Sequence, residues 1–98
     1  MNIQAMMKQA QKLQSDMMKV KDEIEKMEFS CTNGLVTIKV NGKKEVIDVK
    51  IVNDSDFSND DLEMLQDMIE IAINDAMKQV DKVTEEKMGR FSSIPGLF

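Results

Sequence analysis

The sequence predicts an α+β protein with a long N-terminal helix, a three-stranded antiparallel meander and a long C-terminal helix, paired through its helices into a homodimer. Three observations lead to this prediction. Apolar residues keep a heptad spacing through residue 27. Two Asn-Gly dipeptides then separate alternating apolar runs, which is typical of consecutive hairpins. A capping pattern near residue 58 opens a second helical stretch with an apolar face.

The first helix is predicted from apolar residues that recur at spacings of three and four. They are Ile3, Met6, Ala10, Leu13, Met17, Val20, Ile24 and Met27. This spacing is the a/d seam of a coiled coil, and a helix of ~25 residues would be ~38 Å long. A chain of 98 residues cannot easily cover so long a seam by itself. We therefore expect a second copy to cover part of it, through an interface at Met6, Ala10, Leu13, Met17 and Val20.

The middle of the chain changes to the period of two that is typical of strands. The alternating apolar residues are Phe29 and Cys31, then Val36, Ile38 and Val40, then Ile47, Val49 and Ile51. Asn33-Gly34 and Asn41-Gly42 lie between these runs. Asn-Gly favours a type I′ turn, which needs a positive φ at both central residues. The pattern predicts a meander whose apolar face needs a helix to cover it.

The second helix is predicted to begin after Ser58, with Asp61 completing the cap and Phe57 packing against Leu62. Its apolar face extends to about Met88, and Gly89 is the expected stop. Residues 1–90 are then expected to form one α-β-β-β-α domain, which also carries the expected dimer interface. Residues 91–98 are expected to be a flexible tail, because they include Ser92-Ser93 and Pro95-Gly96.

The composition argues against an enzyme. The chain has no histidine, so a Ser-His or Cys-His pair is impossible. Its single cysteine cannot supply the sulfur ligands of a zinc site, and its four glycines form no phosphate-binding loop. We therefore expect no catalytic residues, no metal and no cofactor. The lone cysteine suits a reducing cytoplasm, and no apolar run approaches the ~18 residues of a membrane span.

A calcium site is also not expected. Asp54, Asp56 and Ser58 resemble the start of an EF-hand loop, but Asn59 and Leu65 stand where the loop needs its glycine and its bidentate glutamate. A capped acidic loop explains these residues. Cys31 is expected to be a small residue packed in a strand rather than a reactive thiol.

The net charge of −5 is unevenly distributed. Residues 1–52 contain nine lysines and seven acids, whereas residues 53–98 contain four basic and eleven acidic residues. Nucleic-acid affinity depends largely on neutralised phosphates, so an acidic chain can bind DNA only through local basic surfaces.

Two such surfaces are candidates. Lys8, Lys12, Lys19 and Lys26 lie off the seam, and the last three share a heptad position that spaces them ~10 Å apart. Lys78, Lys82, Lys87 and Arg90 gather near the end of the second helix. One interpretation is a surface that contacts DNA phosphates. The other is a solvated helix face whose charges complement the helix dipole. The sequence leaves both open.

Several segments together resemble the YbaB/EbfC nucleoid-associated proteins. They are MMKQAQKLQ, GLVTIKVNGKKEVIDVKI, LEMLQDMIEIAINDAMKQV, EKMG and the terminal PGLF, in the family's order over nearly the whole chain. The resemblance implies a bacterial, tweezer-shaped homodimer of the cytoplasm and nucleoid that binds double-stranded DNA. A role in nucleoid organisation and gene regulation follows from the same resemblance.

Backbone contacts with little base reading are expected, because the chain shows no recognition-helix motif and no zinc finger. It also has no Trp or Tyr to stack on single-stranded bases. The alternative is a dimeric adaptor whose acidic second helix or apolar tail docks a DNA-processing protein. The sequence does not decide between a phosphate-binding surface and a protein-docking surface.

Overall fold

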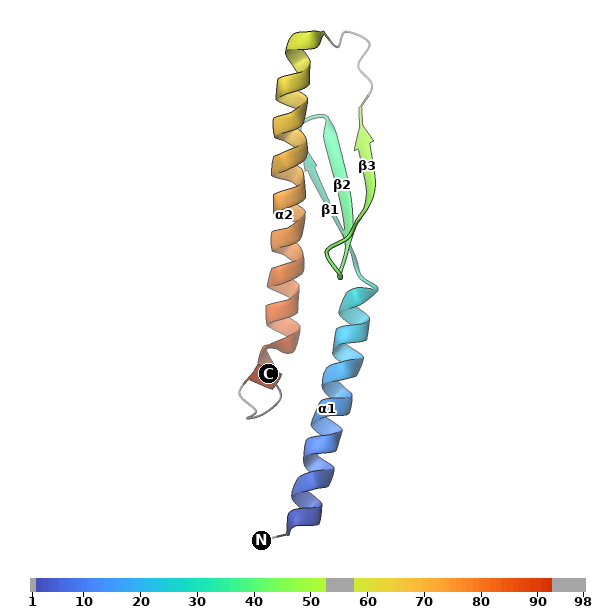
Figure 1. Cartoon of the computed structure of the whole chain (residues 1–98), viewed down its shortest axis with the longest axis vertical. Coiled ribbons are helices and arrows are strands. Elements are labelled where there is room, and N and C mark those ends of the chain that lie inside the picture. Colours follow the sequence, from blue (N-terminus) through green and yellow to red (C-terminus); the bar gives the residue numbers. More distant parts are fainter. Residues whose placement is uncertain (1, 53–57, 93–98) are drawn as a thin grey trace.

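The computed structural model describes residues 2–52 and 58–92. Helix α1 (Ile3–Glu25) is followed by strands β1 (Glu28–Asn33), β2 (Val36–Asn41) and β3 (Val46–Ile51), and then by helix α2 (Asn59–Ser92). The molecule is a rod of 73 × 18 × 14 Å (Figure 1). The sheet and the first half of α2 form one end, and α1 extends past them to the other end (Figure 1). The predicted order of elements is confirmed.

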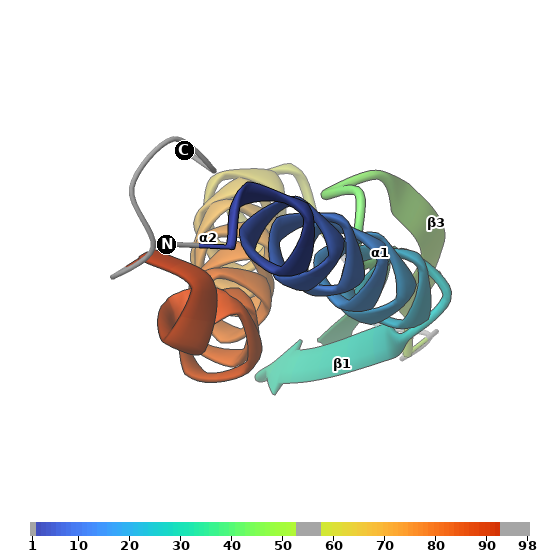
Figure 2. The ribbon, with the colours of Figure 1, turned by 90° about the horizontal axis from the view of Figure 1, so that it is seen from below.

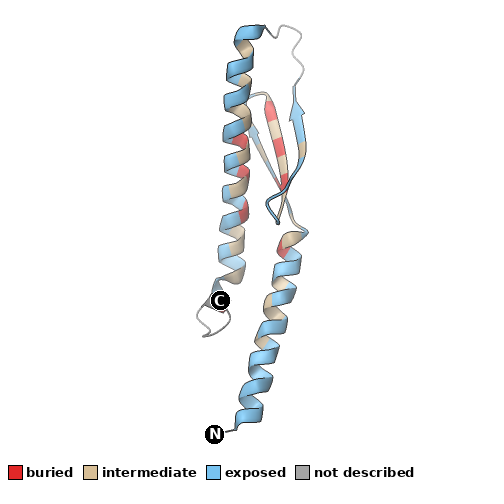
Figure 3. Cartoon of the chain, in the orientation of Figure 1, coloured by how far each residue is buried: buried red, intermediate tan, exposed pale blue. Residues whose placement is uncertain are grey.

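The core lies between the sheet and the middle of α2. Valines and isoleucine of β2 alternate inward at Val36, Ile38 and Val40, each fully buried. Ala72, Ala76 and Val80 of α2 pack against them together with Phe29 of β1. Figure 3 shows this core as a short buried band in an otherwise exposed molecule. Small alanines let the helix approach the sheet closely, since they add little bulk between backbone and strand.

The three strands pair antiparallel in the order β1-β2-β3. Cys31 lies opposite Ile38, which lies opposite Val49, so the predicted apolar positions share one face of the sheet. The register shifts by one residue between Lys39 and Val40, where β3 forms a bulge near Val46. The predicted meander is therefore confirmed.

The predicted turn chemistry is wrong in detail. In the first hairpin the positive φ falls on Gly34 but not on Asn33, so the turn is not type I′. In the second hairpin the positive φ falls on Lys44 rather than Gly42. Asn41 directs this turn instead, because its side-chain oxygen accepts hydrogen bonds from the backbone N–H groups of Lys43 and Glu45 at 2.9 and 3.0 Å. The hydrogen bonds of the Asn41 side chain therefore shape this turn, in place of the type I′ geometry that Asn-Gly usually favours.

Helix α2 begins as predicted and ends later than predicted. The backbone N–H of Ser58 donates to the carboxylate of Asp61 at 2.8 Å, which is the reciprocal half of a capping box. Phe57, the expected partner of Leu62, lies outside the described residues. At the other end the helix continues through Gly89 to Ser92.

Phe91 gives the physical reason for the longer helix. Its side chain is only 1% exposed. Burying a phenylalanine contributes ~2–3 kcal/mol, more than the ~1 kcal/mol that a helical glycine costs. The first two residues of the predicted tail therefore belong to the helix. Residues 93–98, the rest of that tail, lie outside the described residues.

Candidate nucleic-acid interface

Helix α1 and the second half of α2 lie side by side and run in opposite directions (Figures 1 and 2). We call this pair the arm: α1 together with residues 78–92 of α2. The contact uses the C-terminal half of the predicted seam, where Ile24 is buried and Leu13, Met17 and Val20 are half-buried. The arm is therefore held partly by the chain's own packing.

The N-terminal half of the seam has a different environment. Ile3 and Met6 are 68% and 55% exposed, and Ala10 is also exposed. Of the five residues predicted at a dimer interface, Met6 and Ala10 are thus exposed. The other three, Leu13, Met17 and Val20, are already half-buried within the single chain. A role for the seam in dimerisation stays a prediction.

The joint between the arm and the sheet is tightly built. The backbone N–H of Gly42 donates to the carbonyl of Met27 at 3.1 Å, which ties the β2–β3 turn to the end of α1. A Cβ at Gly42 would lie 1.7 Å from the carbonyl oxygen of Ile24. Lys44, in the same turn, forms an ion pair with Asp81 of α2. The turn therefore holds both helices of the arm and fixes the direction in which it projects.

All eight basic candidates are exposed on the arm or at its joint. They are Lys8, Lys12, Lys19, Lys26, Lys78, Lys82, Lys87 and Arg90. Within residues 2–52 and 58–92, none of these seven lysines forms an ion pair with a carboxylate. The guanidinium of Arg90 lies over the ring of Phe91, 4.5 Å from its centroid. The structure thus brings the two basic groups onto one pair of adjacent helices.

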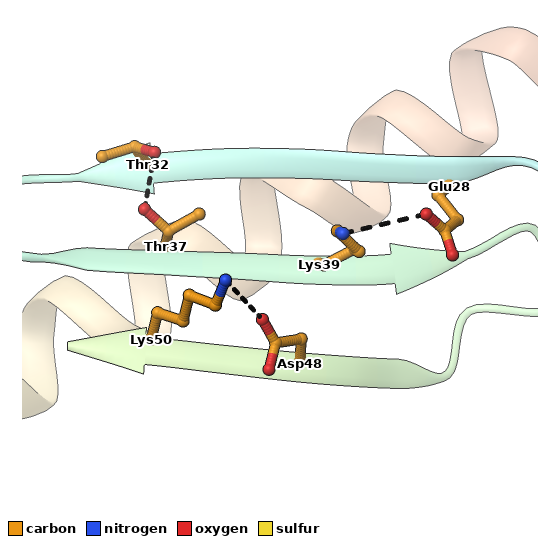
Figure 4. Close-up of polar contacts among 6 residues, drawn as sticks. All are labelled: Glu28, Thr32, Thr37, Lys39, Asp48 and Lys50. Atoms are coloured by element: carbon orange, nitrogen blue, oxygen red, sulfur yellow. Dashed lines mark hydrogen bonds and ion pairs between the residues drawn. The ribbon is translucent and has the colours of Figure 1, made fainter.

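Three of the four lysines of the sheet and its turn behave differently, and the fourth, Lys43, is exposed and has no ion pair within the described residues. Lys39 pairs with Glu28 and Lys50 with Asp48, each at 3.8 Å, and Lys44 pairs with Asp81 (Figure 4 shows the first two). A neighbouring carboxylate partly cancels the positive charge of a lysine, so that lysine attracts an incoming phosphate less strongly. The available positive charge of the described residues is therefore concentrated on the arm.

Charge also changes along α2. Residues 59–77 contain six acids and no lysine or arginine, whereas residues 78–92 contain four bases and three acids. Residues 3–15 of α1 contain Lys8 and Lys12 and no acid. The acidic half of α2 lies beside the sheet, at the opposite end of the rod from the N-terminus of α1 (Figure 1). The molecule is electrostatically polarised along its length.

Sequence reasoning missed Lys21. This exposed lysine lies next to the seam rather than opposite it, and it lines a cavity of 410 Å³ between α1, the β2–β3 turn and α2. The other lining residues are Met17, Ile24, Glu25, Gly42, Thr84 and Met88. Its heptad position, four residues after Met17, was the available signal, because that position flanks a coiled-coil seam.

Among residues 2–52 and 58–92, the other chemical candidates form no metal cluster and no activated thiol. Burial raises the pKa of the half-buried Cys31 thiol, and the negative charge of Asp75 acts in the same direction, opposed by a hydrogen bond from Gln79. A raised pKa favours the unreactive thiol. The described residues contain no cluster of three potential metal ligands. Asp54 and Asp56 lie outside them.

Comparison with known proteins identifies the family. Residues 1–94 match the model of the YbaB/EbfC DNA-binding family. The chain belongs to this family. A nucleoid-associated protein of Oceanobacillus iheyensis is 45% identical over 102 aligned positions, covering 99% of this chain and 97% of the relative. Another from Clostridium novyi is 46% identical over 103 positions, covering 100% and 90%. The YbaB/EbfC family consists of DNA-binding proteins and not of enzymes, which confirms the prediction of no catalytic activity.

A solved structure supports the fold of the chain independently. The crystal structure of an uncharacterized protein from Helicobacter pylori matches with a TM-score of 0.76, covering 95% of this chain and 99% of that one. Its sequence identity of 18% limits the comparison to the fold. No helix in the described part of this chain is long and apolar enough to span a membrane.

Proposed function

We propose that this YbaB/EbfC-family protein binds double-stranded DNA as a homodimer, mainly through contacts between its lysines and backbone phosphates. The arm is the binding surface, and the acidic half of α2 faces away from the duplex. The protein would act at the nucleoid in the cytoplasm, where nonspecific phosphate contacts suit DNA organisation and an influence on transcription.

The unpaired lysines of the arm are the observation that carries this proposal. Seven exposed lysines project from two adjacent helices without a carboxylate partner in the described residues, while the three lysines of the sheet and turn that form ion pairs are occupied. Releasing the counterions condensed on DNA favours binding by such free cations. Phosphate contacts of this kind position a protein without reading bases.

The test is a titration of the protein with a mixed-sequence duplex at several salt concentrations. Lys8→Gln, Lys12→Gln and Lys19→Gln together should weaken binding and lower the slope of log affinity against log salt by ~0.9 for each lost contact. Glutamine keeps a similar helix propensity, so α1 should stay folded. The loss should be similar for duplexes of different sequence.

The matched control removes the same number of charges outside the two helices. Lys39→Gln, Lys43→Gln and Lys50→Gln together change the net charge equally and leave the Lys44–Asp81 pair of the joint intact, so they should leave most of the affinity and the salt slope in place. If the two triple variants lose affinity equally, binding follows net charge and the arm is not the site. If neither loses affinity, the α1 surface is only a solvated face.

The second candidate function is the protein-docking adaptor. It is favoured by the acidic half of α2, where Leu62, Met64 and Ile71 are 53%, 44% and 46% exposed among six acids. Such a surface suits a basic, partly apolar protein partner. The adaptor becomes the better hypothesis if the wild-type protein does not bind duplex DNA even at low salt, where phosphate binding is strongest.

A further inference from the structure

The first turns of α1 carry an apolar stripe that the other described residues leave exposed. Ile3, Met6 and Met7 are 68%, 55% and 57% exposed, and Ala10 is exposed as well. We call these four residues the tip stripe. They continue the seam whose later part packs against α2, but α1 extends past the end of α2 (Figure 1). The tip stripe is therefore the unpaired continuation of a helix contact within the chain.

The end of α1 that carries the stripe is a formed helix. The side-chain oxygen of Asn2 accepts a hydrogen bond from the backbone N–H of Ala5 at 3.2 Å, which caps the first turn. The apolar side chains are thus held on one face before any partner arrives, so a contact at this face costs little ordering of the backbone.

The lysines at this end of α1 lie on the other side of the helix. At 3.6 residues per turn, Lys8 and Lys12 lie about 150–170° around the helix from the centre of the tip stripe. Gln4 and Gln9 flank the stripe at about 110° on either side. A duplex held by the two lysines would leave the stripe facing away from the DNA. The stripe and its flanks carry no charge, so they favour an equally uncharged partner surface.

The tip stripe is symmetric about its own midpoint. Ile3 and Ala10 lie equally far from the point between residues 6 and 7, and so do Met6 and Met7. We propose that the tips of two homodimers pack antiparallel about a two-fold axis at this point. Each Ile3 then faces Ala10 of the second copy, and each Met6 faces Met7. A large side chain meets a small one at both ends, and flexible methionines fill the centre.

This inference rests on the proposed function and adds a contact between homodimers that are bound to DNA. The size of the stripe sets the strength of that contact. Its four side chains can bury only about a few hundred Å² on each tip, whereas stable interfaces bury ~1,200–2,000 Å² in total. Two tips therefore separate in dilute solution. They meet when DNA holds them side by side.

Cooperative DNA binding follows from this weak contact. A contact with a Kd of about 0.1 mM, at an effective concentration of about 1 mM, favours binding at adjacent sites about tenfold. Each homodimer carries two tips, so pairing at one tip leaves the other available. Homodimers can then form a row along the duplex, and the lysines of each tip remain free for phosphate.

The test compares two lengths of duplex. Met6→Gln with Met7→Gln removes the apolar centre of the stripe without changing charge, and glutamine has a helix propensity similar to that of methionine. On a short duplex that holds one homodimer, this tip variant should bind as the wild type does. On a duplex several times longer, the wild type should bind each site about tenfold more tightly. The tip variant should lose this gain.

The matched control is Met18→Gln with Met64→Gln. These methionines are 54% and 44% exposed but lie outside the tip stripe, so the control should keep the cooperative gain. No gain in the wild type, or an equal gain in the tip variant, would overturn the proposal. A lower unfolding midpoint of the free tip variant than of the control would overturn it too, because another part of the same chain would then cover the stripe.

A mixed cysteine cross-link tests the register without DNA. In a Cys31→Ser background, Ile3→Cys and Ala10→Cys are made in separate proteins and oxidised at a protein concentration near the Kd of the contact. The mixture should form a disulfide between the two variants faster than either variant forms one with itself. The reason is that identical positions of the two tips lie ~10 Å apart along the helix axis, beyond disulfide reach. Equal rates would contradict the antiparallel register.

The two readouts separate this contact from the proposed function. A mixed cross-link in a protein that binds no duplex would refute the proposed function alone. Duplex binding with no cooperative gain and no preference for the mixed cross-link would refute the tip contact alone.

Discussion

The geometry of the arm depends on contacts made by single residues, which the amino-acid composition does not reveal. Gly42 was expected to supply a positive φ, yet that conformation belongs to Lys44. Gly42 is needed because the end of α1 passes so close that a side chain has no room. The lysines show a similar contrast: exposed residues of one chemical type differ in availability because only some have a carboxylate within reach.

Gly42→Ala should therefore destabilise the protein by about 2–4 kcal/mol, since the added Cβ meets backbone atoms of Ile24 and Glu25 that cannot rotate away. Denaturant unfolding followed by circular dichroism measures this change. Gly89→Ala is the matched control, because its Cβ would meet nothing within 4 Å, and it should stabilise by ~0.5–1 kcal/mol. Equal effects of the two substitutions would contradict the tight joint.

At the scale of elements, periodicity predicted most of the fold. Heptad spacing located α1 and alternation located all three strands, because both patterns record which side of an element is buried. Helix ends and turns were less predictable, since Asn41 and Phe91 act through contacts that spacing does not reveal. The basic residues were identified from the sequence. Their pairing was not, because an ion pair such as Lys44 with Asp81 joins residues far apart in the chain.

The end of α2 gives a prediction at this scale. Phe91 is buried where the sequence suggested a tail, so Phe91→Ala should lower the free energy of unfolding by about 3 kcal/mol. A shift in the denaturant midpoint without a change in slope would confirm a simple loss of packing. An unchanged midpoint would show that Phe91 contributes nothing and that the domain ends near residue 90, as the sequence suggested.

For the whole molecule, the central question is how a chain of net charge −5 could bind a polyanion. Distance and screening provide an answer. Along α2, Glu70 lies ~12 Å from Lys78, the nearest base of the arm, and ~26 Å from Lys87. The Debye length is ~8 Å at physiological ionic strength, so the acids up to Glu70 are partly screened from DNA at Lys78 and largely screened from DNA farther along the arm. Net charge is then a poor guide to affinity, and the local charge of the arm decides it.

The last prediction tests this polarity. Glu63→Gln, Asp67→Asn and Glu70→Gln together make the protein less negative by three charges, at exposed positions that avoid the helix cap. Duplex affinity at about 0.15 M salt should change only slightly, because these positions lie ~12 Å or more from Lys78, about one and a half Debye lengths, and about three Debye lengths or more from Lys87. At about 0.01 M salt the Debye length grows to ~30 Å, and the same variant should bind more tightly than the wild type. A fluorescence titration at both concentrations distinguishes the cases. A large gain at physiological salt would mean that the acids lie near the DNA, and the binding surface would then have to include the first half of α2.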